Sequence, residues 1–176
     1  MALNLRLFNL KVNYEIVELE EFTGKGATIY SVIMGNGADT LFDGFLRENV
    51  VAYKEEVKSI VGRLNQMGTT IGARAQFFKQ EEGKPGDGVC ALYDEPDSKL
   101  RLYCIRYGNV AIILGGGGPK AKKIKAWQED EKLEKEAKLM IRLSKDILNR
   151  IQAGDLEWSK DGRQLLGNLK ISDDDE

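Results

Sequence analysis

Hydrophobic residues follow two different spacings along the chain, and their order predicts a mixed fold. Apolar runs of strand length, alternating or continuous, occupy residues 12–19, 27–34, 89–93, 100–107 and 110–114. The three- and four-residue spacing of a buried helix face marks residues 41–47, 50–67 and 131–152. We therefore predict an α+β domain in which an antiparallel sheet, built from an N-terminal hairpin and a later meander, packs against an αα-hairpin and a C-terminal helix. Residues 3–10 add an edge strand or a short packing arm.

Short polar residues and a glycine indicate where the first two helices begin and end. Asp39 or Thr40 is expected to cap the helix at 41–47 through a side-chain oxygen. Gly68 is a natural stop for the helix at 50–67. Because almost nothing separates the two helices, they are expected to form an αα-hairpin between two strands.

The C-terminal part of the chain predicts a long helix followed by a small hairpin. Asp130 is a good N-cap, with acidic residues in the first turn, where the helix dipole favours negative charge. The helix is expected to end near Gly154. Within residues 156–169, Asp161 and Gly162 are expected to form a turn between two short runs.

Residues 100–114 have the pattern of a tight antiparallel hairpin. Gly108 and Asn109 separate two strand-like runs, and both residue types tolerate the positive φ that a two-residue turn requires. The first strand alternates strictly, with Leu100, Leu102, Cys104 and Arg106 on one face and Arg101, Tyr103, Ile105 and Tyr107 on the other. Each face therefore carries polar or aromatic groups.

Length and composition are those of an ordinary globular protein. The chain has 176 residues, of which 42% are hydrophobic and 31% are charged. No apolar run approaches the ~20 residues that span a bilayer. No signal peptide is evident, so we expect a cytoplasmic protein with no membrane partner. Residues 1–154 are assigned to one domain with extra N-terminal strands, and residues 155–176 to a C-terminal hairpin and acidic tail.

The residue types present restrict the chemistry. The absence of histidine from the sequence excludes Ser-His-Asp and Cys-His catalysis and histidine-ligated zinc. Cys90 and Cys104 lack metal-ligand spacing, and we expect small buried side chains on neighbouring strands in a reducing cytosol, with a disulfide as the alternative. The sequence predicts no metal site and no cofactor.

Positive charge is concentrated in one segment of an otherwise acidic chain. The formal net charge is −2, yet residues 119–150 carry ten Lys and Arg against six Asp and Glu. The cations of interest are Lys120, Lys122, Lys123 and Lys125, with Arg101 and Arg106 on the adjoining hairpin. In one interpretation they grip a nucleic-acid backbone while Tyr103 or Tyr107, together with Trp127, stacks on bases. In the other interpretation the lysines are simply solvated and the aromatic rings belong to the core.

The run Gly115–Gly118, followed by Pro119 and Lys120, allows two interpretations. Successive glycines let backbone N–H groups converge on a phosphate, and a lysine adds charge. The spacing does not match the GxxxxGK[ST] pattern of nucleotide triphosphatases or the GxGxxG pattern of dinucleotide-binding proteins. The alternative is a strand exit that needs positive φ and close packing.

The order of elements, and the segment LRLYCIRYGNVAIILGGGGPKAKK in particular, resembles the RelE/HigB superfamily of toxin–antitoxin toxins. That family has an arginine-bearing strand, a glycine-containing hairpin, an apolar strand and a pair of lysines. The resemblance extends over about residues 27–153. By position, Arg101 and Arg106 match the strand arginine, and Lys120, Lys122 or Lys123 match the lysine pair.

The resemblance implies a metal-independent endoribonuclease that cuts mRNA at the ribosome and is neutralised by a cognate antitoxin. In such enzymes Arg and Lys stabilise the charge of the phosphorane-like transition state while a polar side chain assists the 2′-hydroxyl. On this basis Arg101, Arg106, Tyr103 and Lys120 are the expected catalytic residues. The expected RNA-binding residues are Lys122, Lys123, Lys125, Tyr107 and Trp127.

Four departures from the family pattern favour a second hypothesis. The chain is longer and more acidic than typical members, it carries additional hairpins, and its lysine pair lies behind four glycines. The alternative function is therefore a non-catalytic protein-interaction module on the same scaffold. A further hypothesis is that the acidic tail, residues 172–176, folds over the lysines as an internal mask.

Overall fold

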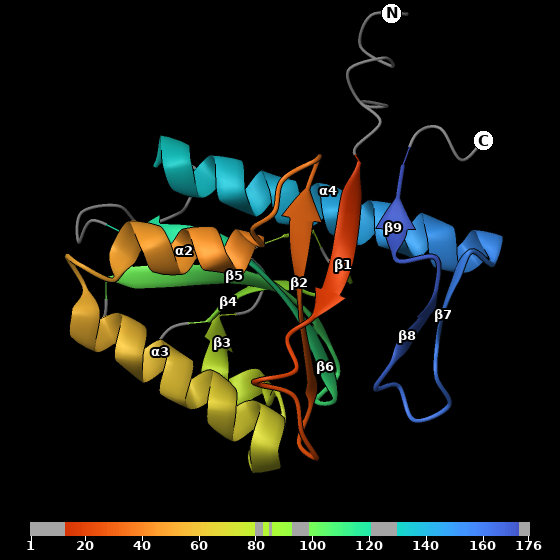
Figure 1. The fold of residues 1–176 in the computed structure, drawn as a ribbon, viewed down its shortest axis with the longest axis horizontal. Coiled ribbons are helices and arrows are strands. Elements are labelled where there is room, and N and C mark those ends of the chain that lie inside the picture. The colour runs from red at the N-terminus through yellow and green to blue at the C-terminus, as the bar shows by residue number, and fades with distance from the viewer. Residues whose placement is uncertain (1–12, 80–82, 85, 93–98, 121–129, 173–176) are drawn as a thin grey trace, which may run out of the picture.

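The computed structural model describes residues 13–79, 83–84, 86–92, 99–120 and 130–172. These residues form a seven-stranded sheet with helices on both faces and a separate two-stranded hairpin (Figure 1). The strands are β1 (Tyr14–Glu18), β2 (Thr28–Met34), β3 (Phe78–Lys79), β4 (Val89–Leu92), β5 (Leu100–Tyr107), β6 (Ala111–Pro119), β7 (Leu156–Trp158), β8 (Leu165–Gly167) and β9 (Lys170–Ile171). The α-helices are α2 (Leu41–Asn49), α3 (Lys54–Gln66) and α4 (Glu131–Ala153). The predicted α+β class is confirmed.

The large sheet has the order β3-β4-β5-β6-β2-β1-β9. The expected N-terminal hairpin, β1 with β2, and the expected meander, β4-β5-β6, are both present and antiparallel. They join through β2 and β6, which run parallel, so the sheet is not antiparallel throughout. A parallel pair needs a long crossover between its strands, and α2, α3 and the first strands of the meander supply one here.

Two hydrophobic cores lie on opposite faces of this sheet. The alternation predicted for β5 is confirmed, because Leu102 and Cys104 pack in the core covered by α2 and α3. Tyr103 and Ile105 pack in the core covered by α4 and the β7–β8 hairpin. The two faces of β5 therefore pack against different helices. Two residues of β5 that are separated by an odd number of positions lie on opposite sides of the sheet.

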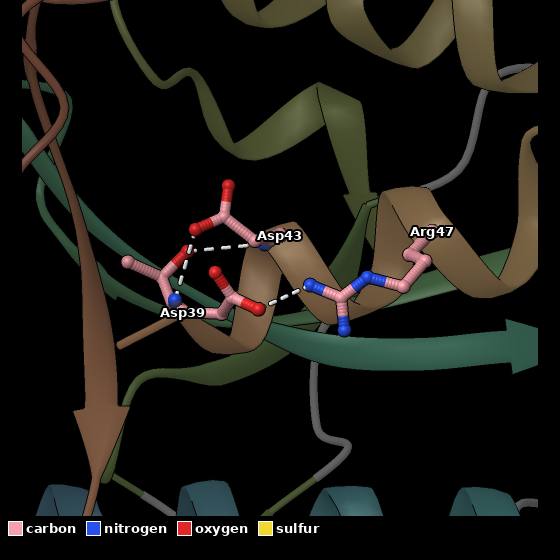
Figure 2. A network of polar contacts seen from close by, with 4 residues as sticks. Asp39, Asp43 and Arg47 are labelled. Carbon is pink, nitrogen blue, oxygen red and sulfur yellow. Dashed lines mark hydrogen bonds and ion pairs between the residues drawn. The ribbon is translucent and has the colours of Figure 1, made fainter. Parts of the chain in front are cut away.

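Helix α2 begins with a complete capping box. The Asp43 N–H donates to Thr40 Oγ1 at 3.0 Å, and the Thr40 N–H donates to Asp43 Oδ2 at 2.9 Å. Figure 2 shows the carboxylates of Asp39 and Asp43 at this end of the helix, with Arg47 extended along the helix to pair with Asp39. Of the two predicted caps, Thr40 is the one used.

Helix α3 differs from its predicted bounds at both ends. Residues 50–53 form a turn instead of the first helical turn, and Val50 is 44% exposed, not part of the buried stripe. At the other end the chain continues as a π-helical turn (Met67–Ile71) and stops at Gly72, whose φ is +77°. Gly68 is not the stop. It is a contact glycine, because a Cβ there would lie 1.5 Å from the carbonyl oxygen of Phe22.

The C-terminal elements follow the prediction closely. Asp130 caps α4 by accepting the Leu133 N–H, and Gly154 ends the helix in the left-handed region at φ +86°. The β7–β8 hairpin turns through Gly162, as expected. Strand β9, which was not predicted, pairs antiparallel with β1 at the edge of the large sheet. The proposed edge strand at 3–10 and the acidic tail at 173–176 lie outside the described residues.

Candidate functional site

Two of the predicted catalytic cations lie together at the open end of the β5–β6 hairpin. Arg101 is directly opposite Gly118, and the Lys120 N–H donates to the carbonyl oxygen of Lys99 at 2.7 Å, continuing the ladder past the strand end. Lys120 is two residues beyond Gly118, so the alternation puts it on the same face of the sheet as Arg101. That face is the one covered by α4.

Arg106 does not belong to this group. It lies five residues from Arg101 along β5, about 17 Å away and on the opposite face. Its Nε donates to the carbonyl oxygen of Ala73 at 2.6 Å, and a terminal nitrogen donates to Asn109 Oδ1 at 2.5 Å. Arg106 therefore ties the segment after α3 to the hairpin turn, which is a structural task.

Of the two tyrosines of the predicted site, Tyr103 is buried and Tyr107 is partly buried. Tyr103 is 1% exposed and lies in the core beneath α4. The ring of Tyr107 lies 4.8 Å from that of Trp158, and its buried hydroxyl has no hydrogen-bond partner. Burial, and then the negative charge of Asp87, raise the pKa of Tyr107 well above its ordinary value. The buried Tyr103 ring is therefore not available to stack on a base, and the raised pKa of Tyr107 keeps its hydroxyl protonated at neutral pH.

The four remaining predicted residues are Lys122, Lys123, Lys125 and Trp127. They lie outside the described residues. The described part of the site therefore consists of the strand ends and the elements packed against them.

The glycine run continues β6 as a strand. None of the four glycines has a positive φ, so the phosphate-loop interpretation and the expectation of an unusual backbone conformation are both wrong. The run contains a β-bulge, because Cys104 pairs with Leu114 while Leu102 pairs with Gly117. The expectation of close packing is correct, and the neighbours explain why side chains are excluded.

Helix α4 crosses directly over the glycine half of β6. A Cβ on Gly115 would lie 2.4 Å from the sulfur of Met140, and one on Gly116 would lie 2.5 Å from a carboxylate oxygen of Glu136. At Gly118 the contact is looser, with Lys132 Cε 3.5 Å from the same position. Glycine thus allows the first turns of α4 to approach the strand backbone.

A small groove opens beside the glycines where β2 and β6 part. Their pairing ends at Ser31 and Leu114. There the Ser31 hydroxyl donates to the Leu114 carbonyl at 2.8 Å and accepts the Phe42 N–H at 3.3 Å, which holds α2 beside β6. The groove has a volume of about 190 Å³ and is lined by Asp39, Thr40, Leu41, Gly44, Phe45, Arg47, Glu48, Gly116, Gly117 and Glu136.

Two charged residues of α4 at this place were missed by the sequence prediction. Glu136 is half-buried, and burial raises the pKa of its carboxyl, an effect that Lys132 opposes and Glu48 reinforces. Lys132 forms an ion pair with Glu48 that joins α4 to the last turn of α2. The available signal was spacing, since Lys132, Glu136 and Met140 are four residues apart and follow one stripe of the helix.

Comparison with known proteins gives no relative: no protein-family model, curated protein or solved structure matches this chain. Among the described residues, no group of three or more His, Cys, Asp or Glu side chains is arranged to hold a metal ion. Within the same residues, none of the helices has the length and apolar character required to traverse a bilayer.

Proposed function

We propose that this protein is a RelE/HigB-like toxin, a metal-independent endoribonuclease that cuts mRNA at the ribosome and is neutralised in the cytoplasm by a cognate antitoxin. The observation that carries the proposal is the placement of Arg101 and Lys120 on one face at the open end of the β5–β6 hairpin. The order of elements supports it, because a strand, two helices, a three-stranded meander and a long helix follow one another as in that superfamily.

The proposed chemistry uses the two cations for electrostatic stabilisation. The 2′-hydroxyl oxygen attacks the adjacent phosphorus and gives up its proton, while the bond from phosphorus to the 5′-oxygen breaks and that oxygen takes up a proton. The products are a 2′,3′-cyclic phosphate and a 5′-hydroxyl. Arg101 and Lys120 stabilise the charge that develops on the phosphoryl oxygens.

A carboxyl group is the best candidate for the proton acceptor, because Tyr103 is buried in the core and the pKa of Tyr107 is raised. Glu136 lies one helical turn from Lys132 and borders the same glycine strand. Because burial raises its pKa, its carboxylate is a stronger base than an exposed glutamate.

Induction of the protein alone in a bacterial host tests this function. The wild-type chain should arrest growth and deplete full-length mRNA, and Arg101→Ala combined with Lys120→Ala should restore growth. Lys145→Ala, which removes an exposed charge from α4, is the matched control and should remain toxic. Normal growth and intact mRNA with a well-expressed wild-type chain would refute the proposal.

An exposed apolar surface favours a second function, that of a non-catalytic protein-interaction module. Val51 is 90% exposed and Val50 is 44% exposed in the turn between α2 and α3, beside an open hollow of about 490 Å³. If this surface is the functional one, Val51→Asp should abolish binding to the protein encoded by the neighbouring reading frame. RNA binding should then be absent at every salt concentration.

A further inference from the structure

The open end of the hairpin carries a third cation, contributed by a different element. Lys132 lies over Gly118, with its Cε, Cδ and Nζ atoms 3.5, 3.7 and 3.9 Å from the position of a Cβ on that glycine. Gly118 is directly opposite Arg101, and side chains at paired positions share a face and are ~5 Å apart at Cβ. Arg101, Lys120 and Lys132 therefore converge on one face of the sheet from β5, the end of β6 and α4.

The partner of Lys132 is weakly held. Glu48 and Lys132 are 52% and 45% exposed, and ion pairs at such positions are screened by water and contribute little. Glu48 also lies in the last turn of α2, where the helix dipole disfavours a carboxylate. A competing anion that binds Lys132 from the open end of the hairpin would also lie near the two strand-end cations, Arg101 and Lys120.

We propose that Lys132 is a phosphate-binding residue of the RNA site and that Glu48 occupies it in the absence of RNA, so that the Lys132–Glu48 ion pair is exchanged for a contact to a backbone phosphate. This inference rests on the proposed function and adds a residue and a form of internal competition to it. Glu48 acts as a positioning residue here, since it reaches the RNA only through Lys132.

The test measures binding of a fluorescent single-stranded RNA with 2′-O-methyl groups, which cannot be cleaved, over a range of KCl concentrations. Lys132→Gln should weaken binding three- to tenfold near 100 mM KCl. It should also reduce the steepness of the log–log salt dependence by about 0.7, the value for one lost phosphate contact on a single strand. Lys132→Arg should retain most of the affinity.

The Glu48→Gln variant gives the more specific test. Removing the competitor should strengthen RNA binding about threefold or more, and this gain should vanish in the Lys132→Gln background, because Glu48 then has nothing to compete for. If Glu48→Gln strengthened RNA binding only by removing one negative charge, the gain would persist in the Lys132→Gln background. That result would overturn the proposed exchange of Glu48 for a phosphate.

A second ion pair on α4 serves as the matched control. Lys138 and Glu134 are joined at 2.6 Å on the same helix, and Lys138 points to solvent. Lys138→Gln and Glu134→Gln should leave RNA affinity and its salt dependence nearly unchanged. Equal effects at Lys132 and Lys138 would overturn the inference while leaving the RNase proposal standing. A wild-type chain that binds no RNA would instead refute the proposed function itself.

Discussion

The two ends of the β5–β6 hairpin carry the same residue type in contrasting surroundings. At the turn end, Arg106 donates to a backbone carbonyl of the segment after α3 and to the side chain of Asn109. At the open end, Arg101 lies opposite a glycine and donates to the carbonyl oxygen of the adjacent Leu100 at 3.0 Å, with Lys120 and Lys132 on the same face. Arg106 thus joins two segments that are distant in the sequence and holds the fold together, whereas grouped cations lower the cost of bringing a phosphate close.

Two neighbouring glycines provide the largest expected effect at the open end. Gly117→Ala should destabilise the protein by about 3 kcal/mol, because its Cβ would lie 1.8 Å from the Arg101 carbonyl oxygen and the backbone must shift. Gly118→Ala, whose nearest contact is the flexible Lys132 side chain, should cost less than about 1 kcal/mol. Urea denaturation measures both, and equal losses would show that the two glycine positions are packed alike.

The arginines themselves come next. Arg106→Ala should lower the free energy of unfolding by about 2 kcal/mol, because a charged donor is lost and the Ala73 carbonyl loses its partner. Arg101→Ala should cost less than about 1 kcal/mol in the same urea experiment but abolish toxicity. A large stability loss at Arg101 with retained toxicity would reverse the assignment of the two ends.

Removing one hydroxyl at the turn end should increase stability. The Tyr107 hydroxyl is buried without a hydrogen bond, so Tyr107→Phe should raise the free energy of unfolding by about 1 kcal/mol. Tyr14→Phe is the comparison, since the Tyr14 hydroxyl donates to Asp146 Oδ2 at 2.5 Å and its loss should be destabilising. Thermal unfolding of both variants gives the sign, and a destabilised Tyr107→Phe would point to a bound water.

The smallest effect concerns Glu136 and depends on pH. Burial raises the pKa of its carboxyl in the folded state above the ordinary value of about 4.3. The ionised form is therefore penalised by folding, and stability is lost as the pH rises from the ordinary pKa through the raised one. Glu136→Gln should stabilise the protein at pH 7 by up to about 1 kcal/mol and have no effect near pH 3.5. Thermal melts across this range measure it, and an effect independent of pH would contradict it.

Local patterns were sufficient to predict most of the elements of this fold. The strict alternation from Leu100 to Tyr107, the Gly108 turn and the Asp130 and Gly154 caps each depend on neighbours in the sequence, and each is found in the structure. The start of α3 was wrong because Val50 fits a helical stripe by spacing, while the chain needs residues 50–53 to turn between α2 and α3.

The candidate site was harder to predict because it depends on contacts between distant residues. Periodicity put Arg101 and Arg106 on opposite faces, yet grouping by charge joined them into one site. The parallel pairing of β2 with β6 and the crossing of α4 over Gly118 bring Glu48 and Lys132 together, although they are 84 residues apart. No local pattern contains that information.

The glycine run divides β6 into two halves that should differ in how readily they open locally. Residues 111–114 are paired on both sides, by β5 and β2. Of residues 115–118, Gly117 and Gly118 pair with β5, Gly115 and Gly116 lie in the bulge, and none has a side chain to anchor it. The second half is therefore held in its conformation by the helices that cover it. Amide hydrogens of residues 115–118 should exchange with solvent when the first turns of α4 open locally. Those of residues 111–114 should exchange only on global unfolding.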